Sequence, residues 1–303
     1  MFNDIKDGKV MVDTDGGSMN LGLDQILSFK RDPGDRNRTS PFAFTGNRFE
    51  FRAVGSSQSV AGPLVAMNTM LADSLEWIAD RLEEVLPEGD ITQDQRATAV
   101  VTVLQGLMEQ HSAVLFGGDG YSEEWHREAV EERGLRNLPT CADALPVLLE
   151  DDVVALFNRT GVLRPVELES RFEVYAEQYV LSIGVEAKLM VEMAKTIIYP
   201  AAMTYLGELA ATASKTQKLG VEFDTSVITS LSESAGALLV AANALQDAVD
   251  SYEPGSAGEH MRYCADTIRT LMDDVRTPAD ALENLVADRL WPLPKYREML
   301  FIR

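Results

Sequence analysis

Residues 63–86 read PLVAMNTMLADSLEWIADRLEEVL, and this stretch decides the fold class. Apolar residues recur in it every three or four positions, which predicts an amphipathic helix. Pro63 suits the first turn of a helix, because the N–H that proline lacks has no partner there, and Pro87 and Gly89 end the pattern. The predicted apolar face consists of Leu64, Met67, Leu71, Leu75, Ile78, Leu82 and Val85.

Helical signals continue from this stretch to the C-terminus. Thr92 and Gln95 have the spacing of a capping box, in which each residue satisfies an N–H group of the other. Ser122 precedes an acidic first turn, and Gly134 follows the same segment as a predicted C-terminal cap.

The longest predicted helix runs from Pro165 to about Lys218, and Pro200 is expected to kink or split it. Further helices are expected over about residues 140–150, 151–158, 225–252, 259–274 and 279–289. The fold class is therefore mainly α.

The first 62 residues differ from the rest of the chain. They are rich in Gly, Asp, Asn, Arg and Phe, and DTDGG, DPGD and TGN are turn signals between short extended runs. These runs cover Lys9–Val12, Pro41–Phe44 and Arg48–Val54. So few strands need a partner surface to be stable. We expect a small β domain over residues 1–62 and a helical region over residues 63–303.

The charge and cysteine content restrict the class of protein. Lys and Arg number 27 and Asp and Glu number 48, which gives a net charge of −21. This acidity argues against binding to nucleic acid or to an anionic membrane surface. Cys141 and Cys264 are too few for a disulfide framework, and we find neither a signal peptide nor an apolar run that approaches membrane-spanning length. A cytoplasmic protein is expected.

One strand carries residues suited to chemistry. Side chains alternate along a strand, so Arg48, Glu50 and Arg52 share one face and Phe49 and Phe51 take the other. Arginine recognises carboxylate and phosphate groups through a planar fork of donors, and a carboxylate can ligate a divalent metal. The same pattern is also typical of a solvated sheet face with weak cross-strand ion pairs.

A resemblance favours the chemical interpretation. Residues 35–52, DRNRTSPFAFTGNRFEFR, and the GSSQSVAGP that follows closely resemble the signature of type III glutamine synthetases. Three further stretches are similar to that class: GDGYSEEWHREAVEERGL, LESRFEVYAEQYVLSIGVEA and the final LWPLPKYREMLFIR. The resemblance covers nearly the whole chain, and it implies that the N-terminal strands are a remnant of the family's catalytic sheet.

The resemblance also implies a reaction and roles for four residues. The family joins ammonia to the side-chain carboxylate of glutamate through a γ-glutamyl phosphate, with ATP and Mg²⁺ or Mn²⁺. Arg38, after Asn37, would face the transferring phosphate, and Arg48 would contact nucleotide phosphate. Glu50 would be a metal ligand, and Arg52 would hold the substrate glutamate. Where type I enzymes have a further arginine, this chain reads PFAF, so the identity of a second phosphate-contacting arginine is left open.

Other parts of the family's site are not found in these 303 residues. They include a glycine-rich segment and the remaining metal-binding glutamates. The sequence is therefore interpreted as the C-terminal portion of a glutamate–ammonia ligase, inactive by itself, that assembles as a homo-oligomeric ring. A second interpretation is a short, non-catalytic relative that acts as a helical interaction module. A third is an unrelated acidic helical scaffold, for which Arg52→Ala would leave glutamate-dependent activity intact.

The remaining candidate residues are assigned structural roles. His111, His126 and His260 have no ligand spacing, and the glycines at positions 117, 118 and 120 lack the context of a phosphate-binding loop.

Overall fold

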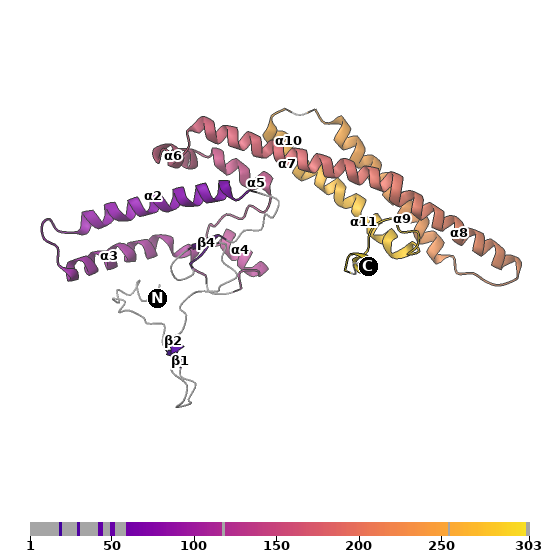
Figure 1. Ribbon diagram of the computed structural model, residues 1–303, viewed down its shortest axis with the longest axis horizontal. Helices are drawn as coiled ribbons and strands as arrows, with labels where there is room; N and C mark the ends of the chain where they lie inside the picture. Colours follow the sequence, from indigo (N-terminus) through magenta and orange to yellow (C-terminus); the bar gives the residue numbers. More distant parts are fainter. Residues whose placement is uncertain are drawn as a thin grey trace. The chain divides into compact units, whose positions relative to one another are not determined.

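The structure is a computed structural model that describes residues 18–19, 29–30, 42–44, 49–51, 59–116, 119–253 and 255–300. The described residues are mainly helical, as the sequence predicts (Figure 1). The chain divides into two compact units. Unit 1 contains Met1–Leu138 and Ala155–Leu163, and unit 2 contains Pro139–Val154 and Arg164–Arg303. The domain boundary near residue 62 stays a prediction.

Unit 1 contains two short antiparallel strand pairs. Strand β1 (Ser18–Met19) pairs with β2 (Phe29–Lys30), and β3 (Phe42–Phe44) pairs with β4 (Phe49–Phe51). The β3–β4 pair falls within two of the predicted extended runs, whereas the third run, Lys9–Val12, lies outside the described residues. That these strands belong to a larger catalytic sheet stays a prediction.

The helices of unit 1 begin with an antiparallel pair. Helix α2 (Ala61–Val85) and helix α3 (Gln93–His111) lie side by side (Figure 1), followed by the short η1 (Ser112–Val114) and α4 (Glu123–Glu131). The capping box at the start of α3 is confirmed. The Thr92 N–H donates to Gln95 Oε1 at 2.9 Å, and the Gln95 N–H donates to Thr92 Oγ1 at 3.3 Å.

Helix α4 has the expected signals at both of its ends. The Trp125 N–H donates to Ser122 Oγ at 3.2 Å, which satisfies one of the N–H groups that a helix start leaves free. At the other end, Gly134 has a φ of +66°, in the left-handed region that glycine adopts without strain. The Leu135 N–H then reaches back to the Ala129 carbonyl, six residues earlier, at 2.8 Å, which satisfies one of the carbonyls that a helix end leaves free.

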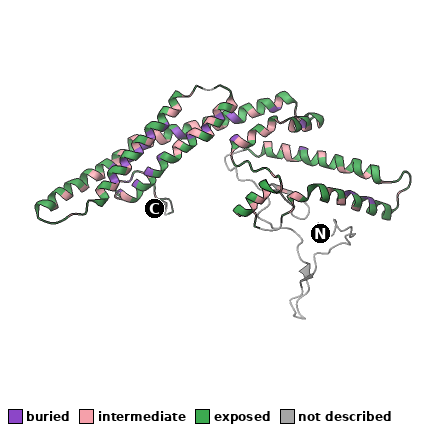
Figure 2. Ribbon diagram, turned by 180° about the vertical axis from the view of Figure 1, so that it is seen from behind, coloured by how far each residue is buried: buried purple, intermediate pink, exposed green. Residues whose placement is uncertain are grey.

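The predicted apolar face of α2 is only partly covered. Among the described residues of unit 1, those classed as buried are few: Thr69, Ala99, Val103 and Phe157. The rest of the α2 face is half-buried or exposed, and Leu75, near its centre, is 57% exposed (Figure 2). The amphipathic helix was predicted correctly, but four of the seven residues of its apolar face remain more than a third exposed: Leu64, Leu71, Leu75 and Val85.

Unit 2 is built from long helices that pack along one another (Figure 1). Helix α6 starts in unit 2 and ends in unit 1. The elements are α5 (Cys141–Ala144), η2 (Leu145–Leu149), α6 (Asp151–Arg159), α7 (Pro165–Met193), η3 (Ala194–Ile198), α8 (Tyr199–Lys218), α9 (Ser226–Ser251), α10 (Ala257–Tyr263), η4 (Cys264–Ile268), α11 (Arg269–Leu285) and α12 (Tyr296–Leu300).

Pro200 lies within the longest helix, directly after a widened turn. The α7–α8 helix continues past it, but η3 is a π-turn in which the Tyr199 N–H bonds to the Ala194 carbonyl, five residues back. Proline has no N–H and its ring clashes with a carbonyl one turn earlier, so widening the preceding turn accommodates it. The helix is therefore neither ended nor split at Pro200.

A second proline lies inside a helix that the sequence analysis divided in two. Residues 257–285 form one continuous helix from α10 through the π-turn η4 to α11, although a break was expected between residues 274 and 279. Pro278 is buried in this helix together with Val275 and Leu282. Packing of this buried face compensates for the hydrogen bond that the proline cannot donate.

The core of unit 2 runs along α9. Its buried residues are spaced by four and three positions in turn, so that they form one stripe facing α7, α8 and α11. Large and small side chains alternate in this stripe, which lets neighbouring helices interlock. The stripe consists of Leu231, Ala235, Leu238, Ala242 and Leu245, all at most 2% exposed.

Helix α9 is also the most apolar of the described helices. With a mean hydropathy of 1.3 over 18 residues, it is long and apolar enough to cross a membrane by length and composition alone, contrary to the sequence expectation. The same test is passed by core helices of soluble proteins, and the leucines of α9 are used here in packing.

Candidate functional site

Glu50 is the one predicted site residue among the described positions. It is the central residue of β4, where the register places it opposite Ala43 of β3, and its side chain is half-buried. Phe49 and Phe51 pair with Phe44 and Phe42 in the same register. Whether this strand pair is a remnant of the family's catalytic sheet stays a prediction.

The three predicted arginines, Arg38, Arg48 and Arg52, lie outside the described residues. Their approach to Glu50 therefore stays a prediction. Within the described ranges, no group of three or more His, Cys, Asp or Glu side chains has the arrangement of a metal site. Glu50 could supply one carboxylate ligand, but a magnesium site usually also takes substrate phosphates and water.

The histidines have the structural surroundings that were expected of them. His260 is half-buried, and its ring packs against Tyr252 with centroids 4.8 Å apart and planes tilted by 33°, while Tyr252 stacks on Tyr263 at 4.0 Å. Burial lowers the pKa of His260. His126 lies at the surface, 4.0 Å from a carboxylate oxygen of Glu123.

Sequence analysis missed an arginine that organises the α3–α4 connection. The guanidinium of Arg133 lies 4.8 Å from the ring centroid of Trp125, and Phe116 stacks on Trp125 at 3.7 Å. Arg133 Nη1 also donates to the carbonyls of Ala113 at 3.2 Å and Leu115 at 2.7 Å. Both N–H groups of Arg133 Nη1 thus bind the segment that follows α3, and Arg133 has a structural role. Its position one residue before the cap glycine was the available signal.

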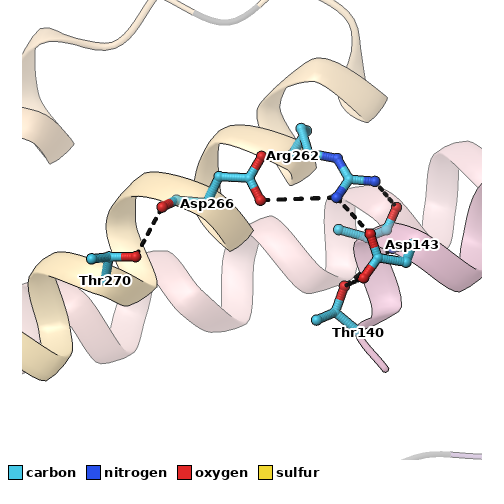
Figure 3. Close-up of polar contacts among 6 residues, drawn as sticks. Thr140, Asp143, Arg262, Asp266 and Thr270 are labelled. Carbon is cyan, nitrogen blue, oxygen red and sulfur yellow. Dashed lines mark hydrogen bonds and ion pairs between the residues drawn. The ribbon is translucent and has the colours of Figure 1, made fainter. Parts of the chain in front are cut away.

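A second polar cluster, also missed, connects parts of unit 2 that are far apart in sequence. Arg262 Nη1 donates to Asp143 Oδ1 at 2.7 Å, and its Nη2 donates to the Ala142 carbonyl at 2.6 Å. Figure 3 shows Arg262 between Asp143 and Asp266, with Thr140 on the far side of Asp143. No spacing rule relates Asp143 to Arg262, so only the fold reveals this pair.

The cluster around Arg262 is suited to holding the fold together rather than to catalysis. Hydrogen bonds from Thr140 and Arg262 lower the pKa of Asp143, which is therefore a poor proton donor or acceptor near neutral pH. Both oxygens of Asp143 are already engaged, one by Thr140 and one by Arg262. The Arg262 pair thus connects α10 to the α5 segment.

Unit 1 also contains a shallow apolar groove between α2 and the segment after α6. It has a volume of about 390 Å³, and none of its lining residues is titratable. Thr69 Oγ1, one of the polar atoms there, donates to the Val65 carbonyl within its own helix. The lining residues are Leu64, Val65, Asn68, Thr69, Ala72, Thr160 and Val162. The groove can accommodate apolar groups but offers no groups for proton or phosphoryl transfer.

Comparison with known proteins identifies the family. The family model described as glutamine synthetase C-terminal domain matches residues 99–217. The type-3 glutamine synthetase of Dictyostelium discoideum is 38% identical over 295 residues, which are 94% of this chain and 39% of that protein. The glutamine synthetase of Bacteroides fragilis (strain YCH46) is 32% identical over 298 residues, 94% of this chain and 40% of the relative.

A third relative gives the same result. The glutamine synthetase of Butyrivibrio fibrisolvens is 32% identical over 283 residues, which cover 91% of this chain and 39% of the relative. The chain thus spans about two fifths of the length of the curated relatives it matches. The resemblance inferred from residues 35–52 and from the helical stretches is confirmed: the chain is similar to a type-3 glutamine synthetase along 94% of its length, and residues 99–217 match the glutamine synthetase C-terminal domain.

Proposed function

We propose that this chain forms one wall of the active site of an ATP-dependent glutamate–ammonia ligase. The observation that carries the proposal is the signature at residues 35–52, within a chain that resembles type III glutamine synthetases along 94% of its length. In this proposal Arg38 faces the transferring phosphate, Arg48 contacts nucleotide phosphate, Glu50 ligates the metal and Arg52 holds the glutamate substrate.

The chemistry of these residue types supports the assignment. Phosphoryl transfer needs cations that are already in position where negative charge accumulates, and arginine provides a planar donor fork for phosphate and carboxylate oxygens. A strand holds side chains on a fixed backbone, and Glu50 lies at the centre of β4, within its pairing with β3. Glu50 would help to hold Mg²⁺ or Mn²⁺, which would supply positive charge to neutralise the phosphates of ATP.

We further propose that these 303 residues make no glutamine by themselves. The glycine-rich segment and the other metal-binding glutamates of the family are not found among them. The apolar face of α2 supports the need for further protein, since Leu64 and Leu75 are 43% and 57% exposed in this chain. The whole enzyme is proposed to be a cytoplasmic homo-oligomeric ring that takes glutamate, ammonia and ATP and binds neither nucleic acid nor membrane. The N-terminal strands are proposed to belong to its catalytic sheet.

Complementation tests the proposal directly. The chain is combined with the upstream portion of the Dictyostelium relative, and glutamine and ADP are measured with glutamate, ammonia, ATP and Mg²⁺. Activity is expected from the mixture and not from either part. In the mixture, Arg52→Ala and Glu50→Ala should each lower the rate by about a hundredfold or more, because each removes a positioned charge.

The matched control is Arg276→Ala, since Arg276 is exposed and pairs only with Asp280 one turn away in the described part of α11. This variant should keep the activity of the mixture. Full activity of Arg52→Ala would overturn the assigned role, and glutamine formation by the chain alone would overturn the proposed inactivity.

The exposed apolar faces also favour a second candidate function, a short non-catalytic relative that acts as a helical interaction module. The genomic DNA upstream of the coding sequence separates the two. An in-frame extension that encodes the glycine-rich segment and the missing glutamates supports the enzyme, whereas a promoter and start site directly upstream support the short form.

A further inference from the structure

Helix α7 carries a second apolar face in addition to the one that faces the core of unit 2. Ala176 and Ala187 are buried, and Ile183 is half-buried on the same side. On the opposite side lie four exposed apolar residues, Val174, Leu181, Val185 and Leu189. Leu181 and Val185 are 65% and 66% exposed, so these two side chains are mostly in contact with solvent. At 3.6 residues per turn the four fall within about a quarter of the helix circumference. We call them the α7 seam.

The flanks of the α7 seam suit close packing of another helix. Small or neutral residues lie beside it, among them Ser170, Gln178 and Ser182. Two opposite charges lie on one flank, with Glu177 near the N-terminal end of the seam and Lys188 near the C-terminal end. Both are exposed. A partner helix would bring a cation to Glu177 and an anion to Lys188.

A second copy of α7, packed antiparallel, meets these requirements. In a symmetric antiparallel pair, two residues face each other when the midpoint between them in sequence lies at the symmetry axis. The midpoints of Leu181 with Val185, of Val174 with Leu189 and of Glu177 with Lys188 all fall between residues 181 and 183. A register with its axis near residue 182 therefore brings each pair to within about two residues of facing, about 3 Å along the helix, so that apolar residues meet apolar residues and acid meets base.

We propose that the α7 seam is a self-association surface, at which two copies of the chain pack their α7 helices antiparallel about an axis near residue 182. This proposal deepens the proposed homo-oligomer and rests on it for its biological role, but it does not require the chain to be catalytic. Glu173 and Glu192 lie at the ends of the paired segment, where solvent screens their charges.

The contact should be weak by itself. From Val174 to Leu189 the helix rises about 22 Å, at 1.5 Å per residue. One helix pair of that length buries less than the roughly 1,200 Å² found in stable complexes. Association of the free chain is therefore expected at high protein concentration, and a ring that holds several copies together would strengthen it.

Sedimentation equilibrium of the 303-residue chain tests the proposal. The wild type should show a reversible monomer–dimer equilibrium below about 1 mM, and Leu181→Glu should raise the dissociation constant roughly tenfold or more, since symmetry places two such charges in the contact. The matched control is Val240→Glu on α9, at a position that is 70% exposed and turned away from the core, which should leave the constant unchanged.

Two variants of the charged pair test the register, and a third variant, on α2, tests the other apolar face. Lys188→Glu should weaken association, and Glu177→Lys with Lys188→Glu in one chain should restore it, which a non-specific apolar contact would not do. A wild type that stays monomeric up to about 1 mM, or a double variant without recovery, overturns the proposal. So does loss of association in Leu75→Glu on α2 together with its retention in Leu181→Glu. Glutamine formation is not measured, so this proposal and the proposed enzyme can fail separately.

Discussion

Helices α2 and α9 have similar apolar periodicity but opposite surroundings. In α9 the stripe from Leu231 to Leu245 is buried among α7, α8 and α11. In α2 the corresponding stripe begins at Leu64, and Leu75 near its centre is largely exposed. Periodicity therefore specifies a helix and the direction of its apolar face, but not whether a partner for that face lies within the same chain.

The difference between the two helices reflects a difference between the two units. Unit 2 has a continuous core of its own. Unit 1 contains β4, from the stretch that resembles the glutamine synthetase signature, and few of its described apolar residues are buried. If unit 1 contributes one wall of a larger active site, its uncovered face is where the rest of that enzyme would pack. The contrast thus agrees with the proposed function.

The largest effect on stability is expected when a leucine near the centre of each apolar stripe is replaced by alanine. Leu238→Ala on α9 removes a fully buried side chain and should lower the free energy of unfolding by about 2–5 kcal/mol. Leu75→Ala on α2 should change the stability of the chain by less than about 1 kcal/mol, because the side chain is already mostly in water. Urea denaturation followed by far-ultraviolet circular dichroism measures both.

The same two variants can be compared after the chain is combined with the upstream portion of the Dictyostelium relative. Leu75→Ala should become costly in the complemented enzyme, where its face is covered, while the effect of Leu238→Ala should be the same in both forms. Equal costs for the two variants in the isolated chain would show that α2 is buried in solution and would remove the contrast.

A smaller effect is expected from the Arg262 cluster, which supports unit 2 from outside its core. Arg262→Ala leaves Asp143 without its cation and the Ala142 carbonyl without its donor. The variant should unfold at a lower urea concentration than Arg276→Ala, which removes only an exposed pair within one helix. The loss should be smaller than for Leu238→Ala.

The Arg262 effect should depend on pH. The folded pKa of Asp143 is lowered, so its contribution is present above the unfolded pKa, near 3.8, and is lost as the pH falls through the folded pKa. The difference in stability between wild type and Arg262→Ala should therefore shrink in acid. If the stability difference between wild type and Arg262→Ala stayed constant from pH 7 down to about pH 2, the stabilising effect of Arg262 would not come from the Asp143 carboxylate.

The sequence predicted local structure well and long-range contacts poorly. The capping box at Thr92, the cap at Gly134 and the start of α7 at Pro165 are set by neighbouring residues, and all three are confirmed. The sequence predicted a disturbance at Pro200 but not its form, a π-turn within a continuous helix. The unbroken helix through Pro278 depends on packing of its buried face, which no local pattern encodes.

The same reasoning explains what could be predicted of the site. Glu50 was predicted to lie on a strand because its segment is a short extended run between turn signals, and it lies opposite Ala43 of β3. That this strand belongs to a catalytic sheet stays a prediction. The Arg262–Asp143 pair joins residues 119 positions apart, so it follows from the fold and not from any spacing in the sequence. The roles of Arg38, Arg48 and Arg52 came from resemblance and stay predictions.

The smallest effect is expected at His260 of α10, whose ring packs at a tilt against Tyr252 at the end of α9. Burial lowers the pKa of His260, so folding favours the neutral ring. The contribution of this residue is therefore fully present above the unfolded pKa of about 6.5 and is lost as the pH falls through the folded pKa. Between pH 7.5 and pH 5 the wild type should lose slightly more stability than His260→Gln, which cannot be protonated. Proton NMR titration should place the His260 midpoint below that of an unstructured peptide, and a midpoint above it would show that folding favours the charged ring and would contradict this account.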